Sequence, residues 1–574
     1  MKLRLLLIAI FIGTMGLFAQ DPDTLDVPPL YTDWEGNPNQ PALAHYIVAD
    51  TLENGERKNP NRVYRLERYK DAQNQGIYVL DYGMDIDFSL RLVAEEGDGR
   101  PPLIVPEYTS TGGVLGYHFK LIGDSDTHVF KNIFFQRVNL DRAFTSDFLK
   151  GILFDGDSLR VEVEGCVFNA FTGNALQFTG QHNSIFIKDC VFRNGEWPSL
   201  PWIGQQNYFG NGNRIDTLVF TNNTYFNNNS YWLLHEGHVA DYVVFEHNTI
   251  MTSAIDALHM RLLVNANIRS NLFYGYAAYG DTDHARTSGS WYEADGDSLA
   301  IISLDALGRI ASNWGDVEEN RTINVTHNAY YTPQALQDYY ADYANYDPPH
   351  SDVDPVTAPL WMNLRTQSMF DDDAGYPYLI EEANLAEVDP QFADTEMDTW
   401  VTGAVAQYCR DLRETSTTDG WGTSVHRNYD AYLGDDICTG IQWPLPEGAL
   451  EITNAAMLTA GHDGLPIGNL NWDPASRAKY RAPYEPPLGI KEFGEDYTPE
   501  FKLYPNPVRD MLTIHAPERI ESVEVYSITG AKQILQTVSG DSTVQIDLSA
   551  LSEGIYLVRL STSRGTATEL FMKH

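Results

Sequence analysis

The fold of this chain is decided by a short pattern, which is clearest in FTNNTYF (220–226), FEHNTIM (245–251) and IRSNLFY (268–274). Each segment has an apolar first residue, an asparagine in fourth place and an aromatic or aliphatic residue in sixth place. Half of the neighbouring copies start 23–25 residues apart, a period typical of repeat architectures. Four more copies carry Asn or Cys in fourth place: VFKNIFF (129–135), VEGCVFN (163–169), IKDCVFR (187–193) and VTHNAYY (325–331).

The pattern predicts a bend at its centre. In an unbroken strand the first and sixth residues would face opposite sides, yet both are apolar in every copy. Asparagine suits the bend because it tolerates the left-handed backbone region better than other non-glycine residues do. Stacked copies would bring the fourth-place side chains into one internal column, where amides can hydrogen-bond to one another. The predicted members of this ladder are Asn132, Cys166, Cys190, Asn223, Asn248, Asn271 and Asn328.

The chain has four cysteines, too few to be the main brace of so long a protein. Cys166 and Cys190 occupy the predicted ladder, so we interpret them as small buried thiols, with a disulfide between them as the alternative. Cys409 and Cys438 flank a loop rich in Gly and Asp, and the sequence does not decide whether they pair.

Short strands, frequent turns and a repeat of about 24 residues predict an all-β fold, a parallel β-solenoid. The unit lacks the leucine spacing and helical segment of a leucine-rich horseshoe, and its in-phase repeat argues against a sandwich of hairpins. Its V-x-x-N-x-F rungs resemble the right-handed parallel β-helices of the pectate-lyase-like superfamily over about residues 110–400. That scaffold carries lyases, hydrolases, esterases and non-catalytic adhesins, so the resemblance implies a fold and leaves the activity open.

The last residues form a separate unit of alternating strands and turns. YPNPVRD (504–510), Ser527–Gly530, Gly554–Tyr556 and the basic end at Lys573 resemble the type A (Por) C-terminal sorting domain of the Bacteroidetes type IX secretion system. The resemblance implies a small β-sandwich recognised by that machinery, and a protein that is secreted or attached to the outer-membrane surface. An ordinary carbohydrate-binding β-sandwich is the alternative.

The first residues predict Sec export. Lys2 and Arg4 precede the apolar run Leu5–Ile12, which is too short to span a bilayer, and no later stretch is long enough to span one. The predicted organisation is a signal peptide (1–19), an N-terminal cap with the first rungs (20–109), the β-helix (110–400), an irregular C-terminal cap (401–480), a linker rich in Pro and Glu (481–499) and the sorting domain (500–574).

The charge balance restricts the partners. The chain has 39 Lys and Arg against 79 Asp and Glu, a formal net charge of −40, which excludes the basic footprint of a nucleic-acid binder. The same charge would repel acidic polysaccharides at low salt unless Ca²⁺ or a local basic patch intervened. We therefore expect Ca²⁺ as the one candidate cofactor, with Asp371–Asp373 as a weak candidate for its ligands, and we expect a monomer.

Candidate catalytic residues come from the predicted alignment of a second sheet. Aligning GILFD (151–155), ALQFT (175–179), WLLH (232–235) and ALHMR (257–261) points His235, His259 and Arg261 outward on one face. There they could bind a uronate carboxylate and remove a proton in a β-elimination. Charged residues that merely solvate the face are the alternative, and the more frequent one. The predicted substrate-binding residues are Trp197, Trp202, Tyr208 and Gln177.

Two functions follow from the sequence. The first is an exported protein that acts on extracellular polysaccharide, either as a lyase of an acidic glycan or as a glycoside hydrolase. The second is a non-catalytic glycan-binding or adhesive surface protein on the same scaffold. Whether the protein is an enzyme stays open at this point, because no nucleotide loop, zinc motif or nucleophile elbow is present.

Overall fold

The computed structural model divides the chain into two compact units, Met1–Tyr480 and Arg481–His574. The described residues are 23–29, 43–71, 74–107, 115–137, 149–171, 173–195, 206–210, 213–228, 232–253, 258–281, 298, 300–309, 316–318, 321–344, 355–414, 443–480, 501–516, 520–527, 532–537, 542–549, 551–552, 554–562 and 565–573.

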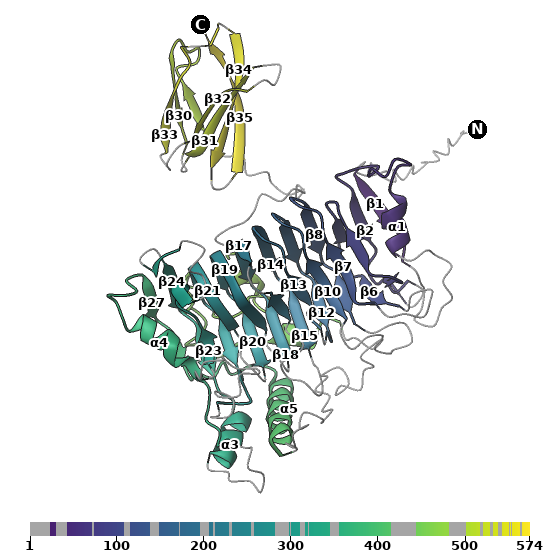
Figure 1. Ribbon diagram of the computed structural model, residues 1–574, viewed down its shortest axis with the longest axis vertical. Coiled ribbons are helices and arrows are strands. Elements are labelled where there is room, and N and C mark those ends of the chain that lie inside the picture. Colours follow the sequence, from purple (N-terminus) through teal and green to yellow (C-terminus); the bar gives the residue numbers. More distant parts are fainter. Residues whose placement is uncertain are drawn as a thin grey trace, which may run out of the picture. The chain divides into compact units, whose positions relative to one another are not determined.

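The first unit is a parallel β-helix with three faces, as the sequence predicted (Figure 1). Each rung adds one strand to face A, one to face B and one to face C, and every pairing between rungs is parallel. Two long strands, β19 (Leu233–Glu246) and β21 (Leu258–Arg269), run without a break from face C into face A. These two strands join faces A and C into one hydrogen-bonded sheet, while face B forms a second sheet.

The strands are short and follow one another in the order A, B, C. Face A contains β1 (Thr24–Val27), β2 (Val63–Leu66), β5 (Arg91–Ala94), β8 (Thr127–Lys131), β11 (Arg160–Glu164), β14 (Asn183–Lys188), β17 (Arg214–Thr221), the ends of β19 and β21, β24 (Thr322–Thr326) and β27 (Leu379–Glu382). Face B contains β3 (Ile77–Leu80), β6 (Leu103–Pro106), β9 (Phe134–Gln136), β12 (Val167–Asn169), β15 (Val191–Gly195), β18 (Thr224–Asn228), β20 (Thr249–Ser253), β22 (Leu272–Tyr274), β25 (Ala329–Tyr331) and β28 (Leu385–Ala386). Face C contains β4 (Met84–Ile86), β7 (Tyr117–Leu121), β10 (Lys150–Phe154), β13 (Leu176–Phe178), β16 (Asn207–Phe209), the starts of β19 and β21, β23 (Ala300–Ser303) and β26 (Leu360–Met362).

An asparagine ladder fills the corner between faces A and B. The amide of Asn223 donates to Oδ1 of Asn248 at 3.0 Å, and Asn248 donates to Oδ1 of Asn271 at the same distance. Each of these Oδ1 atoms also accepts the backbone N–H of the preceding ladder residue. It therefore satisfies two donors of that residue, the side-chain amide and the backbone N–H. The ladder continues through Asn328 to Asn384, a member that the repeat pattern missed.

The left-handed residue of the corner is the one before the ladder residue, contrary to the prediction. Asn222, His247 and Ser270 have φ of 57°, 51° and 58°. In the first copy, Asn132 itself has φ of 56° and pairs in register with Gly165, so Ile133 takes the ladder position. Placing Asn132 in the ladder was therefore wrong by one residue.

The two ladder cysteines are free, buried thiols. The thiol of Cys166 lies 3.3 Å from the carbonyl of Phe130, and that of Cys190 lies 3.4 Å from the carbonyl of Val163. Each thiol therefore contacts the backbone carbonyl to which an asparagine amide donates in later rungs. Cys409 is buried within a helix, and Cys438 lies outside the described residues.

Aromatic rings fill the centre of the β-helix in register. Phe135, Phe168, Phe192 and Tyr225 stack on face B with successive centroid distances of 4.9, 5.0 and 5.1 Å. These are sixth-place residues in the corrected alignment, and their burial with the first-place residues confirms that the chain bends between the two.

Residues 443–480, called the strap below, run along the outside of face B. Its residues Leu450, Ile452, Met457 and Ile467 form one apolar cluster with outward side chains of β18, β20 and β22. Nearer the N-terminus, Leu445 joins Phe134 and other outward residues of face B. The sequence had predicted a cap over the open end of the β-helix, whereas the strap covers a lateral face.

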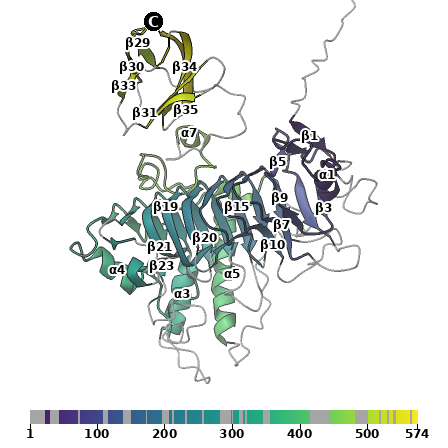
Figure 2. The ribbon, with the colours of Figure 1, turned by 45° about the horizontal axis from the view of Figure 1, so that its top comes forward.

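The helices lie outside the three sheets. Helices α3 (Gln334–Tyr343) and α5 (Thr395–Glu414) pack on each other through a tyrosine-rich cluster and project from the same side of the β-helix (Figure 2). The others are α1 (Leu43–Ala49), α4 (Leu364–Phe370), α7 (Pro474–Arg477) and the 3₁₀ turns Leu307–Arg309 and Pro446–Ala449.

The second unit is antiparallel throughout its described strands. One sheet contains β29 (Lys502–Tyr504), β30 (Met511–His515) and β33 (Thr543–Asp547), and the other contains β31 (Ile520–Ser527), β32 (Lys532–Thr537), β34 (Gly554–Thr562) and β35 (Gly565–Lys573). Both sheets contribute to one buried core, in agreement with the predicted small β-sandwich.

Candidate functional site

The inserted chain of the β-helix gathers at the two edges of face C. The A-to-B corner takes only two residues in most rungs, as between Glu164 and Val167. Long connections lead from face B to face C, where they join β9 to β10, β15 to β16, β22 to β23 and β25 to β26. In the later rungs long connections also lead from face C to face A, where they join β23 to β24 and β26 to β27. Binding residues occur disproportionately in loops carried by a rigid scaffold, so these connections and face C form the candidate binding site.

Face C carries an outward column that crosses the rungs in register. Lys120, Leu153, Gln177 and Tyr208 lie opposite one another on successive strands. Lys120, Gln177 and Tyr208 are partly exposed, and the Gln177 side-chain carbonyl accepts a hydrogen bond from Asn174 at 3.0 Å. The structure thus brings together Gln177 and Tyr208, two of the four predicted substrate-binding residues. Trp197 and Trp202 lie outside the described residues.

The same column continues into β19 and β21, where it is more enclosed. Leu234 pairs with His259, and His259 pairs with Ser303. His259 is only 5% exposed, so it lies at the covered end of the column. His235 pairs with Phe209 and Met260, which are both buried. The predicted alignment of this rung was therefore wrong by one residue, because Leu234, and not Leu233, shares the register of His259.

Arg261 contacts a fully buried carboxylate. Its Nε lies 3.5 Å from Oδ2 of Asp305, while Arg365 Nε lies 2.7 Å from Oδ1 of the same residue. Asp305 has no exposed surface, and its backbone N–H donates to the Arg261 carbonyl at 2.8 Å. Two arginines therefore share one buried carboxylate at this end of face C. The sequence missed Asp305 and Arg365 because neither belongs to the repeat.

The acidic run Asp371–Asp373 does not form a closed ligand set in the described structure. All three residues are exposed, and Asp371 ends helix α4. Asp372 accepts the backbone N–H of Gly375 at 3.1 Å, as expected of a tight turn after a helix.

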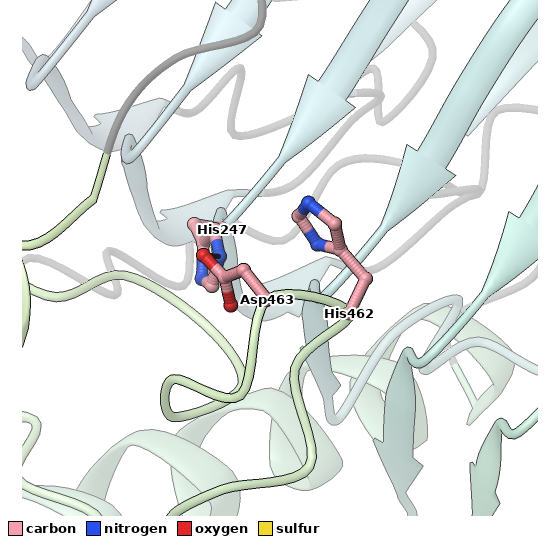
Figure 3. Close-up of side chains that lie close together, drawn as sticks. All are labelled: His247, His462 and Asp463. Atoms are coloured by element: carbon pink, nitrogen blue, oxygen red, sulfur yellow. Dashed lines mark hydrogen bonds and ion pairs between the residues drawn. The ribbon is translucent and has the colours of Figure 1, made fainter.

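A second polar group lies at the A–B corner, where the strap crosses it. His247 is fully buried, and its two ring nitrogens lie 3.2 Å from the Gly468 carbonyl and 3.2 Å from Oδ2 of Asp463 (Figure 3). Nδ1 of His462 lies 2.7 Å from the hydroxyl of Ser270, and the same hydroxyl accepts the backbone N–H of His462 at 2.9 Å. The repeat pattern passed over His247 because it treated the third place as a variable position.

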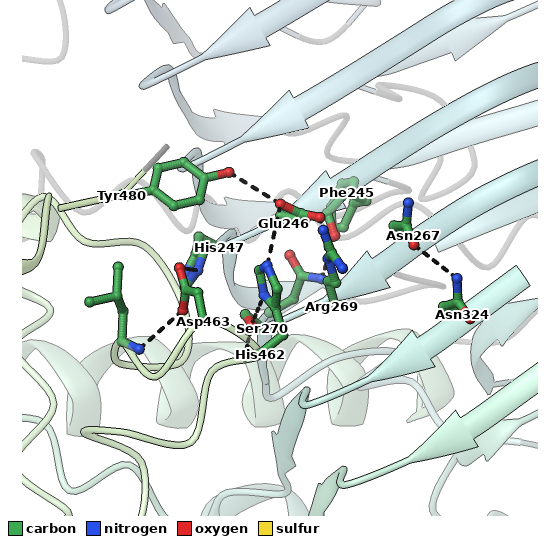
Figure 4. A network of polar contacts seen from close by, with 12 residues as sticks. Phe245, Glu246, His247, Asn267, Arg269, Ser270, Asn324, His462, Asp463 and Tyr480 are labelled. Atoms are coloured by element: carbon green, nitrogen blue, oxygen red, sulfur yellow. Dashed lines mark hydrogen bonds and ion pairs between the residues drawn. The ribbon is translucent and has the colours of Figure 1, made fainter. Parts of the chain in front are cut away.

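A buried carboxylate lies beside these histidines. Glu246 is ion-paired with Arg269, accepts a hydrogen bond from the Tyr480 hydroxyl at 3.3 Å, and lies 4.0 Å from Nε2 of His462 (Figure 4). Burial raises the pKa of Glu246, against the lowering effect of Arg269. Burial, with the nearby Arg269 charge, lowers the pKa of His462 to about 4, so that this ring is neutral at pH 7. Burial is the largest single influence on Asp463 and acts to raise its pKa. The hydrogen bond and charge of His247, the backbone N–H of Leu465 and the charge of His462 together outweigh burial and lower the pKa to about 2.

The comparisons with known proteins assign the C-terminal unit. Residues 502–574 match the family model described as the secretion system C-terminal sorting domain, which marks the protein for export and for secretion or cell-surface attachment. The unit therefore engages the secretion machinery. No curated protein and no solved structure matches the chain. No helix in the described part of the chain has both the length and the apolar character needed to span a membrane.

Proposed function

We propose that this exported β-helix binds an extracellular polysaccharide along face C. The observation that supports the proposal is the outward column of face C, in which Gln177 and Tyr208 are partly exposed and lie in register on neighbouring strands. Lys120 lies in the same column two strands from Gln177 and is ion-paired with Asp155 at 2.8 Å. Strands in a sheet are about 4.8 Å apart, so the column offers an amide and a phenol at a spacing that one sugar unit can bridge. A tyrosine ring provides an apolar surface for a sugar and a hydroxyl that can donate a hydrogen bond.

The other two faces are less suited to a glycan. The strap covers the outside of face B over much of its length. On face A the charged side chains satisfy one another: Lys131 pairs with Glu164 at 3.3 Å, and Arg269 pairs with Glu246. Face C combines partly exposed hydrogen-bonding groups with the inserted connections, and Trp197 and Trp202 belong to one of these, between β15 and β16. We therefore include both tryptophans in the proposed binding surface.

Lyase chemistry on an acidic glycan is the second candidate function. It is favoured by Arg261 and Arg365 on Asp305, whose guanidinium groups could attract a uronate carboxylate to an otherwise acidic protein. His259 remains the proposed proton acceptor, whereas His235 is less suited because it shares the register of the buried Phe209 and Met260. Ca²⁺ held by carboxylates would then assist, as the resemblance to pectate-lyase-like proteins implies.

Replacing Tyr208 with Ala should weaken glycan binding about 10-fold, the effect of losing one aromatic contact of about 1.4 kcal/mol. Affinity electrophoresis of the secreted protein against a panel of neutral and acidic polysaccharides measures the change. Tyr242→Ala is the matched control, because Tyr242 is a partly exposed tyrosine on face A. Equal losses in the two variants, or none in either, would contradict binding along face C.

Incubation with a polyuronate panel and Ca²⁺, monitored by the absorbance of new unsaturated ends, tests the lyase candidate. We expect Arg261→Lys to lower the elimination rate at least 10-fold, because lysine cannot reproduce the forked contacts of a guanidinium. Thermal unfolding of Arg261→Lys controls for stability, because the substitution perturbs a buried carboxylate. No elimination by the wild-type protein, with glycan binding retained, would leave the non-catalytic binding function as the correct one.

A further inference from the structure

We propose that His247, His462 and Asp463 bind a divalent metal ion of the zinc class where the strap crosses the A–B corner. One ligand atom from each residue lies within 4.8 Å of the other two (Figure 3). Zinc bonds to nitrogen and oxygen are about 2.0–2.2 Å long, so donors on one ion lie about 3–4 Å apart. Small side-chain rotations would bring the three atoms to that separation.

The orientation of His247 is the strongest argument. Its Nδ1 faces the Gly468 carbonyl at 3.2 Å, and only a protonated nitrogen can donate there. In the neutral ring Nε2 would then carry a lone pair and face the Asp463 carboxylate, another acceptor, also at 3.2 Å. Two acceptors at this distance require a cation between them, either a proton or a metal ion. A backbone carbonyl on Nδ1 is also the usual outer partner of a histidine that binds metal through Nε2.

His462 brings a second imidazole from the strap. Its ring is fixed by Ser270, which contacts both its Nδ1 and its backbone N–H. Metal binding requires a neutral imidazole. Glu246 lies beside this ring and is ion-paired with Arg269 (Figure 4). Because its carboxylate already has this partner, it is not needed as a ligand.

The donor set and its exposure restrict the choice of ion. Two imidazoles and one carboxylate suit Zn²⁺, Co²⁺, Ni²⁺ or Cu²⁺, whereas Ca²⁺ and Mg²⁺ prefer sites made of oxygen atoms. The side chains of His462 and Asp463 are 17% and 26% exposed, and that of His247 is fully buried. An ion can therefore enter from the strap side and meet His247 last. Three protein ligands leave a fourth position for water.

The site would join two parts of the unit that are distant in sequence. His247 belongs to a rung, whereas His462 and Asp463 belong to the strap, more than 200 residues later. A ligand that binds only the folded form stabilises it, so bound metal would hold the strap against the corner.

Full-length, untagged protein should bind one Zn²⁺ in a titration against a competing chelator, which suppresses weak binding by the acidic surface. Added Co²⁺ should give the visible d–d bands of a four-coordinate ion. We expect His462→Gln and Asp463→Asn each to reduce the affinity by more than 100-fold, and Ser270→Ala, which removes an outer partner, to reduce it by about 10–100-fold. His182→Gln is the matched control, since His182 pairs with Asp216 at 2.9 Å on an exposed turn without a second histidine, and it should leave the affinity unchanged.

Two results would overturn the metal site. If His462→Gln and Asp463→Asn bind Zn²⁺ as tightly as the wild type, the ion is held elsewhere on the acidic surface. If the wild-type protein gives no Co²⁺ bands, the cluster is an imidazolium–carboxylate pair only. Thermal unfolding of each variant in excess chelator shows whether it is folded, and neither readout depends on a glycan.

Discussion

Glu447→Leu should lower the free energy of unfolding of the β-helix unit by about 3–5 kcal/mol, because it leaves a buried guanidinium without its partner. Arg193 in β15 and Glu447 in the strap have no exposed side-chain surface. They form two hydrogen bonds, Nε to Oε1 and Nη2 to Oε2, the latter at 3.2 Å. Asn169 also accepts a bond from Arg193 at 3.3 Å, but this amide oxygen carries no charge that could replace the carboxylate. Urea unfolding of the full chain, followed by circular dichroism, measures the loss.

The double variant Arg193→Met/Glu447→Leu is the informative comparison. It removes both charges and keeps the volume, so most of the stability should return. A cost of only about 1 kcal/mol for Glu447→Leu alone would mean that water reaches the pair, as at a surface ion pair, and that the strap does not seal face B.

Acidification from pH 7 to pH 5 should destabilise the same unit through two core histidines. Burial lowers the pKa of His118 to about 3, and burial with the Arg91 charge lowers that of His128 to about 4. Both stay neutral in the folded unit at pH 5, whereas in the unfolded chain, with a pKa near 6.5, they are protonated. The contribution of the two neutral histidines to the free energy of unfolding is complete above pH 6.5 and is lost as the pH falls toward 4. Each should therefore cost about 2 kcal/mol at pH 5, measured by urea unfolding at both pH values.

His118→Phe separates this effect from general acid sensitivity. His118 lies between the rings of Phe135 and Phe171, at centroid distances of 6.1 and 5.7 Å. Its ring nitrogens have no hydrogen-bond partner among the described residues, so phenylalanine should fit at little cost at pH 7. The variant should lose about half of the pH dependence. An unchanged slope between pH 7 and pH 5 would show that other groups cause it.

The fold could be predicted because the repeat encodes a purely local rule. First-place and sixth-place residues are apolar in all seven copies of the pattern, and the corner between them has one shape. The error at Asn132 arose because Asn suits both places of the corner, as a left-handed residue and as a ladder amide. Only the register with Gly165 distinguishes the two. Cys166 and Cys190 were placed correctly because a small buried thiol fits the column and can contact the backbone carbonyl that an asparagine amide contacts in later rungs.

The candidate sites could be predicted only in part. Gln177 and Tyr208 followed from strand alternation, but the long strand β19 shifted the alignment of His235 by one residue. Asp305, Arg365, His462 and Asp463 carry no repeat signal, because they lie in segments whose positions depend on long-range packing. His247 could not be singled out, because the positive φ of the third place is visible only in the structure.

The strap has a consequence for how the chain reaches its final form. Rungs can assemble on their neighbours in sequence, yet the outer apolar side of β9 and β12 stays exposed to water until Leu445, about 300 residues downstream, packs on it. Closing so large a loop is entropically slow compared with stacking one rung on the next. A molecule whose strap is not yet in place would therefore expose an apolar stripe along face B and tend to self-associate.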